Sequence, residues 1–360
     1  MLFFQIKKPT FYIIFVFLII ILQGFHTQVQ AESTDRRDTA RNLFLEGIEA
    51  FNEQDYQTTL EKFNNCLIIY RELGDQQPQA GILAGIAEIN FYAGRLADCL
   101  SYLKKSKEIY NKLGIKSGED GIVNDIDKSI KAVTFLIEGL GYRDGKNYES
   151  ALKKYNDALL LYKDIDNKEG MIKALYYSGK ACLALNDHSK SWACFKRALT
   201  LSQKTKDKEN VILITMTIGE VYGKKGNFDK SLEYYKQALN IIQEIKNHPS
   251  KGHLLYAIGA SYAGKGNYEE ALKALYKATQ IFKVDNYTPS QGAALTLIGE
   301  INKTLGKYTE AIDNFQEALA LYKISKDSIG QKLAMKALRE IYILLGDDEK
   351  AREYIMEKKK

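Results

Sequence analysis

Two glycine-rich segments of this chain approach the spacing of nucleotide-binding loops. Segment 259–265 has the spacing of a phosphate-binding loop, in which backbone N–H groups hold phosphates. However, Gly266 stands where Ser or Thr would hold magnesium, and the flanking pattern predicts no strand before it. Gly139, Gly141 and Gly145 miss the spacing of a dinucleotide-binding loop by one position. We interpret the glycines of both segments as structural.

Histidines and acidic residues form no catalytic or metal-binding pattern. Beyond segment 1–31 the histidines are His188, His248 and His253, and none has a second histidine at a helical ligand interval. Nothing resembles a nucleophile elbow or a paired Cys and His. Asp and Glu are spread along the chain without defining an acid–base pair. The sequence therefore predicts a protein that is not an enzyme, with no catalytic, cofactor or metal residues and no cofactor.

Four cysteines leave two interpretations open. Cys66 and Cys99 occupy positions where small residues recur, which favours burial as small apolar side chains. Cys182 and Cys194 could form a disulfide between two helices of one hairpin if the compartment is oxidising. Their spacing does not decide between a bridge and two free thiols.

The elements that would position any site are set by a long internal repeat. One position of the repeat, which is mostly glycine, recurs eight times, and we call it the mark of each repeat. Six of the seven gaps between successive marks are 40 positions long. The gap from Ala87 to Gly139 is longer by 12 positions, so a segment is inserted there, within Gly114–Asp125, a Gly- and Asp-containing stretch that we expect to be a loop. The marks are Gly47, Ala87, Gly139, Gly179, Gly219, Gly259, Gly299 and Arg339.

We interpret each repeat as a helical hairpin. Apolar or small residues recur three and four apart around each mark, which predicts a first helix. A turn such as the GKGNY segment follows, and then a second helix that starts with a small residue 12 positions after the mark. The small residues at the mark and 12 positions later let the two helices approach closely, and we expect a bulky side chain four positions further on to fill the gap to the next hairpin. The bulky series is Phe63, Leu103, Tyr155, Phe195, Tyr235, Leu275, Phe315 and Ile355.

This pattern resembles the tetratricopeptide repeat family, on the signature Gly299, Tyr308, Ala311, Phe315 and Ala318. The period resembles the longer repeat of kinesin light chains and of bacterial secreted arrays. The resemblance covers the range 38–358. It implies an all-α fold, a right-handed superhelical α-solenoid of about eight helical hairpins, whose first helices line a concave groove.

The N-terminal segment 1–31 differs from the rest. Lys7 and Lys8 precede the apolar run 11–22, and a small residue, Ala31, stands where a signal peptidase could cut. We expect residues 1–31 to be a signal peptide and residues 32–360 to be the solenoid, exported to the periplasm or outside the cell. The alternative is an uncleaved membrane anchor over residues 11–25, which would be the protein's contact with a membrane.

The net charge excludes little, and the distribution of basic residues argues against one class of partner. Removing the signal segment leaves 49 Lys and Arg against 45 Asp and Glu, a net charge of +4. The basic residues are not clustered with aromatics as in nucleic-acid-binding proteins. We therefore expect a protein or peptide partner and no nucleic acid.

Family positions that line the groove can be carried over copy by copy. They give Phe51, Phe91, Tyr92, Arg143, Lys173, Tyr176, Lys180, Lys224, His253 and Tyr256 as partner-binding residues. Such a surface suits an extended peptide or a helix with apolar anchors and acidic groups. The alternative is that the aromatic residues belong to the hairpin core and that the lysines keep the surface soluble. The family's clamp for a C-terminal carboxylate is not matched, since Lys336 is followed by Glu340.

Together these features predict an exported, non-catalytic scaffold or adaptor. Two alternatives stay open: a periplasmic factor that delivers a ligand or metal or assists assembly, and the recognition or regulatory part of a caspase-like protease system that lacks the protease domain.

Overall fold

The computed structural model describes residues 31–53, 55–115, 121–245 and 248–354, and within these ranges it consists of helices and turns without a strand. The expected signal peptide falls outside the described residues except for Ala31, so its cleavage and the alternative anchor stay predictions. No helix in the described part combines the length and the apolar character that a bilayer crossing requires.

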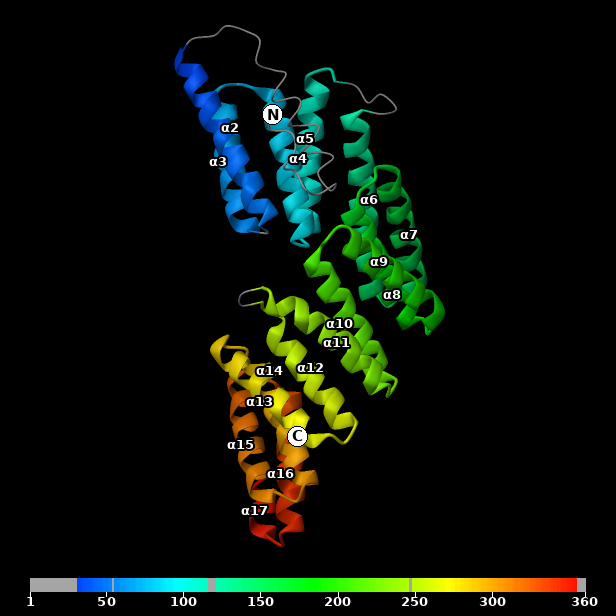
Figure 1. The fold of residues 1–360 in the computed structure, drawn as a ribbon, viewed down its shortest axis with the longest axis vertical. Helices are drawn as coiled ribbons and strands as arrows, with labels where there is room; N and C mark the ends of the chain where they lie inside the picture. The colour runs from blue at the N-terminus through cyan, green and yellow to red at the C-terminus, as the bar shows by residue number, and fades with distance from the viewer. Residues whose placement is uncertain (1–30, 54, 116–120, 246–247, 355–360) are drawn as a thin grey trace, which may run out of the picture. The chain divides into compact units, whose positions relative to one another are not determined.

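The chain divides into two compact units, residues 1–207 and 208–360 (Figure 1). The helices of unit 1 are α2 (Ala31–Asn52), α3 (Tyr56–Glu72), α4 (Gln76–Tyr92), α5 (Leu96–Lys112), α6 (Ile122–Asp144), α7 (Tyr148–Asp164), α8 (Lys168–Ala184) and α9 (His188–Lys204). The helices of unit 2 are α10 (Lys208–Lys224), α11 (Phe228–Gln243), α12 (Lys251–Gly264), α13 (Tyr268–Val284), α14 (Thr288–Thr304), α15 (Tyr308–Ile324), α16 (Ser328–Leu344) and α17 (Asp348–Glu353).

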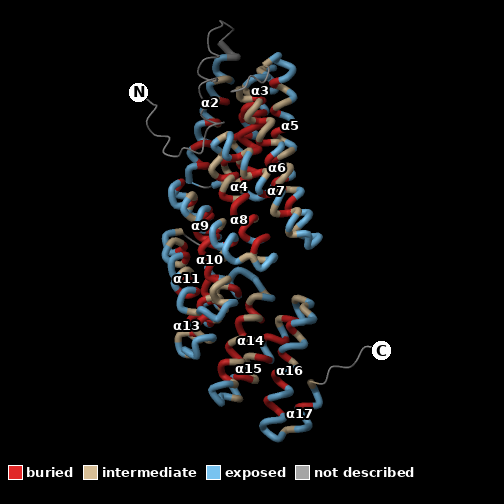
Figure 2. The backbone as a smooth tube through the Cα atoms, turned by 90° about the vertical axis from the view of Figure 1, so that its right-hand side faces the viewer, coloured by how far each residue is buried: buried red, intermediate tan, exposed pale blue. Residues whose placement is uncertain are grey.

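Consecutive helices pair as antiparallel hairpins, from α2 with α3 to α16 with α17. Within each unit every hairpin packs on the next one along the chain. The prediction of an all-α solenoid built from eight hairpins is therefore confirmed over the described residues. Buried residues follow the helix faces that turn toward each other, and exposed residues follow the opposite faces (Figure 2).

The turns inside the hairpins have the chemistry that the sequence predicts. Between α10 and α11, Gly226 has φ of +74°, a conformation that glycine adopts without a steric penalty. The next residue, Asn227, caps α11, because its side-chain oxygen accepts a hydrogen bond from the Lys230 backbone N–H at 3.2 Å. Gly226, in the left-handed conformation, therefore ends the turn after α10, and the Asn227 cap begins α11.

Close helix approach at the marks explains their small residues. A methyl group on Gly139 would lie 2.4 Å from Cε1 of Tyr155, closer than packed atoms approach. Five further marks face the bulky residue 16 positions later in the same way: Gly47 and Phe63, Gly179 and Phe195, Gly219 and Tyr235, Gly259 and Leu275, Gly299 and Phe315. The predicted close approach of the two helices is therefore confirmed at these six hairpins, whereas the bulky residue, expected to fill the gap to the next hairpin, packs against the mark of its own hairpin.

The inserted segment departs from the prediction of a loop. Helix α6 begins at Ile122, so the last four positions of the expected loop are helical. With 23 residues α6 is longer than α4 and α8, which have 17 residues each. The cause is apolar burial, because Val123 and Ile126 are buried on α6 and continue its apolar face toward the N-terminus.

Candidate partner-binding site

The predicted aromatic residues of unit 1 lie mainly in its packed interior. The ring of Phe51, at the end of α2, lies 5.2 Å from that of Tyr92 on α4, in an edge-to-face arrangement. Phe51 is 6% exposed and Phe91 4% exposed. Tyr92 is half-buried. The first helices therefore do not present an open aromatic surface here, and Phe51 fits the interpretation as hairpin core.

Lys173 and Phe91, predicted from different hairpins, do come together. The Lys173 ammonium on α8 lies 5.4 Å from the centre of the Phe91 ring on α4, within range of a cation–π interaction. It also lies 3.1 Å from Oε1 of Glu169 one turn earlier on α8. Further along α8, the exposed Lys180 lies 5.7 Å from the Tyr176 ring centre.

Other predicted basic residues are paired with acids of the chain. Arg143 contacts Asp144 at 2.7 Å in unit 1. Lys224, which is exposed, pairs with Glu220 at 2.6 Å in unit 2. These pairs reduce the positive charge that the predicted lining would offer an acidic partner.

His253 and Tyr256 have neighbours within unit 2. The exposed His253 ring packs 4.9 Å from that of Phe282 and 5.8 Å from that of Tyr287, and its Nε2 lies 3.3 Å from the Ser290 hydroxyl. Tyr256 is half-buried against the apolar residues of α13 and α14. The contacts described for His253 and Tyr256 are therefore all with residues of unit 2.

A small cavity in unit 1 lies beside Phe91, and we call it the Glu88 cavity. It is lined by Ala84, Glu88, Phe91, Cys99, Leu103, Ser129, Val133, Tyr162 and Asn167. These residues come from α4, α5, α6, α7 and the cap of α8. The cavity has room for about two water-sized groups.

Three polar atoms on the wall of this cavity are buried without a hydrogen-bond partner. They are Oε2 of Glu88, Oγ of Ser129 and the hydroxyl of Tyr162. Ser129 is 5% exposed and Tyr162 1% exposed. A buried polar group without a partner costs on the order of 1–3 kcal/mol, so three at one place mark a site where water or a ligand group can supply the missing hydrogen bonds.

Carboxyl groups gather beside the cavity. Burial, and then the charge of Glu169, raise the pKa of Glu88 to about 8. Burial also raises the pKa of Glu169 to about 7, with Lys173 acting in the opposite direction and the hydrogen-bonded Asp207 adding to the rise. The site therefore holds carboxyl groups that titrate near neutral pH.

Sequence reasoning missed the cavity residues. Glu88 directly follows the Ala87 mark, at the repeat position that Lys180 of the predicted lining occupies after Gly179, so this acid was a signal that could have been used. Glu169 and Ser129 stand at one repeat position, ten places before their marks, where proline or a polar residue stands in several other copies. No sequence rule brings Glu88 and Ser129 to one cavity with Glu169 beside it, because the three residues come from three different hairpins.

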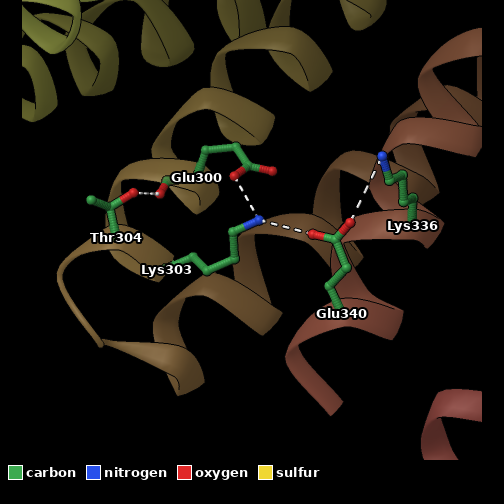
Figure 3. A network of polar contacts seen from close by, with 5 residues as sticks. All are labelled: Glu300, Lys303, Thr304, Lys336 and Glu340. Carbon is green, nitrogen blue, oxygen red and sulfur yellow. Dashed lines mark hydrogen bonds and ion pairs between the residues drawn. The ribbon is translucent and has the colours of Figure 1, made fainter. Parts of the chain in front are cut away.

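Unit 2 carries a network of opposite charges on its first helices (Figure 3). Lys303 on α14 lies 2.8 Å from Glu300 and 3.3 Å from Glu340 of α16, and Lys336 lies 3.8 Å from Glu340. Thr304 donates to the Glu300 backbone carbonyl at 2.8 Å. Lys336 is thus paired with an acid of its own chain.

The remaining reactive side chains are cysteines. All four are free thiols, with Cys66, Cys99 and Cys182 buried and Cys194 half-buried. The thiols of Cys182 on α8 and Cys194 on α9 are hydrogen-bond partners. Among the residues that the structure describes, no group of three or more His, Cys, Asp or Glu could hold a metal ion.

Comparisons with known proteins agree with this architecture. Residues 211–283 and residues 293–324 each match a tetratricopeptide repeat profile. No curated protein matches the chain. The apo form of the quorum sensor NprR from B. thuringiensis has a similar fold, with a TM-score of 0.53 at 15% identity over 94% of this chain and 90% of that chain.

Two further solved structures match parts of the chain. PilW, a type IV pilus biogenesis factor, has a TM-score of 0.48 at 18% identity over 62% of this chain and 90% of that chain. A putative kinesin light chain repeat protein from Podosopora anserina has a TM-score of 0.46 at 14% identity over 54% of this chain and 96% of that chain. Segments 211–283 and 293–324 are therefore tetratricopeptide repeats, and the helical hairpins of the other described residues share this architecture.

Proposed function

We propose that this protein is an exported, non-catalytic scaffold that binds a peptide or protein partner along the first helices of its hairpins, with the Glu88 cavity as an anchor point. The observation that carries the proposal is the set of buried, unpartnered polar atoms of Glu88, Ser129 and Tyr162 in this cavity. A partner group that hydrogen-bonds to them would recover free energy that the chain alone does not.

The surroundings of the cavity suit a partner chain. Tyr92 and Tyr176 are half-buried and Lys180 is exposed, so apolar and polar contacts are both available on α4 and α8. Partly buried tyrosines suit interfaces because the rigid ring supplies contact area and the hydroxyl can form a hydrogen bond. The fold shared with a protein described as a quorum sensor supports a recognition role, at the level of fold alone.

The size of the cavity favours a side-chain tip over a whole small molecule. Sites for drug-sized ligands are several hundred cubic ångströms in volume and enclose most of the ligand. Room for about two water-sized groups instead fits the end of one side chain. The size of the cavity therefore favours a peptide or protein partner over a small ligand that the protein would deliver.

Site-specific photo-crosslinking tests the binding face. A photoreactive phenylalanine analogue replaces Tyr176 on the first helix α8 or, as the control, Leu160, which is 67% exposed on the second helix α7. In the native compartment we expect one discrete adduct from position 176 and none from position 160. Adducts from position 160 alone would place the partner on the second helices and overturn the proposed face.

Charge reversal at exposed lysines adds a second readout. Lys180→Glu and Lys224→Glu change exposed residues of the predicted lining, and Lys173 is left intact because it is mostly enclosed. We expect Lys180→Glu to reduce the adduct at position 176. An unchanged adduct in both variants would remove the basic residues from the recognition surface.

The proposed export depends on residues 1–31 acting as a signal peptide, and this can be tested separately. Mass spectrometry of the protein recovered from the producing cell should give a mature chain that begins at Glu32. An intact N-terminus in the membrane fraction would support the anchored alternative.

A further inference from the structure

We propose that the Glu88 cavity takes a primary ammonium group, supplied by a lysine side chain or by the N-terminus of the bound partner. The inference deepens the proposed function and rests on it, because the partner brings the ammonium group. It assigns a chemical specificity to one position of the binding face.

The charges around the cavity favour a cation. Glu88 interacts with Glu169, and Glu169 interacts in turn with Asp207 and with the basic side chain of Lys173. Cys99 of α5 and Tyr92 of α4 also interact electrostatically with Glu88, while α6 and α7 contribute Ser129, Val133 and Tyr162 to the wall. When Glu88 ionises, three carboxyl groups face the one ammonium group of Lys173, and a second ammonium group would balance the negative charge that this ionisation creates.

The neutral part of the wall suits the same ligand. The rings of Phe91 and Tyr162 lie 5.7 Å apart and both line the cavity. Aromatic faces attract cations, and Lys173 already makes such a contact with Phe91. The hydroxyls of Ser129 and Tyr162 and Oε2 of Glu88 can each accept a hydrogen bond from an ammonium group, which has three donors.

Other ligand classes fit less well. A carboxylate or phosphate would add negative charge next to Glu88 and Glu169. A guanidinium group is larger than the space of about two water-sized groups. A methyl group would fit by size but would leave all three polar atoms without partners.

Binding should change the protonation of Glu88. Its pKa of about 8 keeps most of the carboxyl protonated at pH 7. An ammonium group beside it stabilises the carboxylate, so the proton leaves the site as the cation enters. Proton release is a signature that a merely structural Glu88 would not produce.

Calorimetry on the mature chain tests the inference with defined probes. The peptide Ac-Ala-Lys-Ala-NH₂ supplies a side-chain amine, H-Ala-Ala-Ala-NH₂ supplies an N-terminal amine, and Ac-Ala-norleucine-Ala-NH₂ is the uncharged control. Titrations at pH 7 in two buffers of different ionisation enthalpy count the protons released. We expect at least one amine probe to bind roughly tenfold more tightly than the norleucine control, with roughly one proton released.

Two variants separate a direct role of Glu88 from a structural one. Glu88→Gln keeps the shape of the side chain and removes the ionisable group, so amine binding should fall at least roughly tenfold and proton release should vanish. Glu138→Gln is the matched control, because Glu138 is an exposed acid on α6 that pairs with Lys154. Far-ultraviolet circular dichroism checks that both variants keep their helical content.

Two outcomes would overturn the inference: equal binding of the norleucine peptide, or unchanged amine binding and proton release in Glu88→Gln. A partner adduct at position 176 that persists in either case would leave the proposed function standing. A preference for the lysine probe or for the N-terminal probe identifies the source of the ammonium group, and both support the inference.

Discussion

The ammonium group of Lys173 lies 3.1 Å from the Glu169 carboxylate, with the two side chains only 15% and 4% exposed. A pair this enclosed gains little net stability, because desolvation offsets most of its attraction. Removing one partner is different, since the other charge is left buried and uncompensated. Lys173 is the neighbour that opposes the rise in the pKa of Glu169, whereas the hydrogen-bonded Asp207 adds to that rise.

We therefore expect Lys173→Met to destabilise unit 1 by about 3 kcal/mol. The single tryptophan, Trp192, lies in α9, so its fluorescence during urea unfolding reports on unit 1. Lys180→Met is the control, because Lys180 is exposed and its loss should change stability by less than about 0.5 kcal/mol. Equal effects of the two substitutions would contradict this account of the pair.

Stability of unit 1 should fall as the pH rises from about 4.5 to about 8. The folded state holds a proton on Glu88 up to a pKa of about 8, whereas the unfolded carboxyl releases it near its ordinary value of 4.5. The folded state thus binds more protons in this window, and stability decreases with pH until both states are ionised. Glu169, with its pKa raised to about 7, acts in the same direction.

Glu88→Gln should flatten this pH dependence and stabilise unit 1 at pH 8 by on the order of 2–4 kcal/mol. Urea unfolding of both proteins at pH 5 and pH 8, followed by Trp192 fluorescence, measures the difference. A wild-type slope that persists in the variant would show that Glu88 is not the titrating group.

Gly139 and Gly141 on α6 provide a matched pair for the packing of the marks. Gly139→Ala places a methyl group 2.4 Å from the Tyr155 ring and should cost about 1–3 kcal/mol. Gly141→Ala meets no atom within 4 Å and should stabilise the helix by up to about 1 kcal/mol. Opposite shifts of the unfolding midpoint are expected, and stabilisation by both substitutions would disprove the close approach.

Cysteine reactivity should follow burial. Burial raises the pKa of the Cys66 and Cys99 thiols to about 12, so little thiolate forms at pH 8. Cys194 is half-buried and should react with iodoacetamide first, as peptide mass mapping would show. Mild oxidation should join Cys182 to Cys194 before any other pair, because their thiols are already in contact. Modification of Cys66 as fast as Cys194 would contradict this order.

The network in Figure 3 predicts unequal roles for two lysines. Burial by itself would lower the pKa of Lys303, yet its contacts with Glu300 and Glu340 raise the pKa overall. Lys303→Met would leave these two acids without their shared cation and should cost about 1 kcal/mol. Lys336→Met removes a side chain that is 74% exposed and should cost almost nothing. Thermal unfolding followed by circular dichroism compares them, and the reverse order would refute the assignment.

The fold could be predicted from the sequence because its signals are local and repeated. Helix periodicity, turn residues such as Gly226 and the fit of Gly299 to Phe315 recur at fixed spacing, so each copy supports the others. The inserted segment breaks the period, and there the local signal misjudged how far α6 extends.

The candidate site was decided by the tertiary structure. The sequence shows Phe91, Lys173 and the acid at position 88, but not that Phe91 is enclosed, that Lys173 reaches it, or that Glu88 opens into a cavity. Helix formation depends on residues a few positions apart, which the sequence itself displays. Burial, and the pKa shifts that follow from it, depend on atoms that several hairpins bring together, so they exist only once those hairpins have packed.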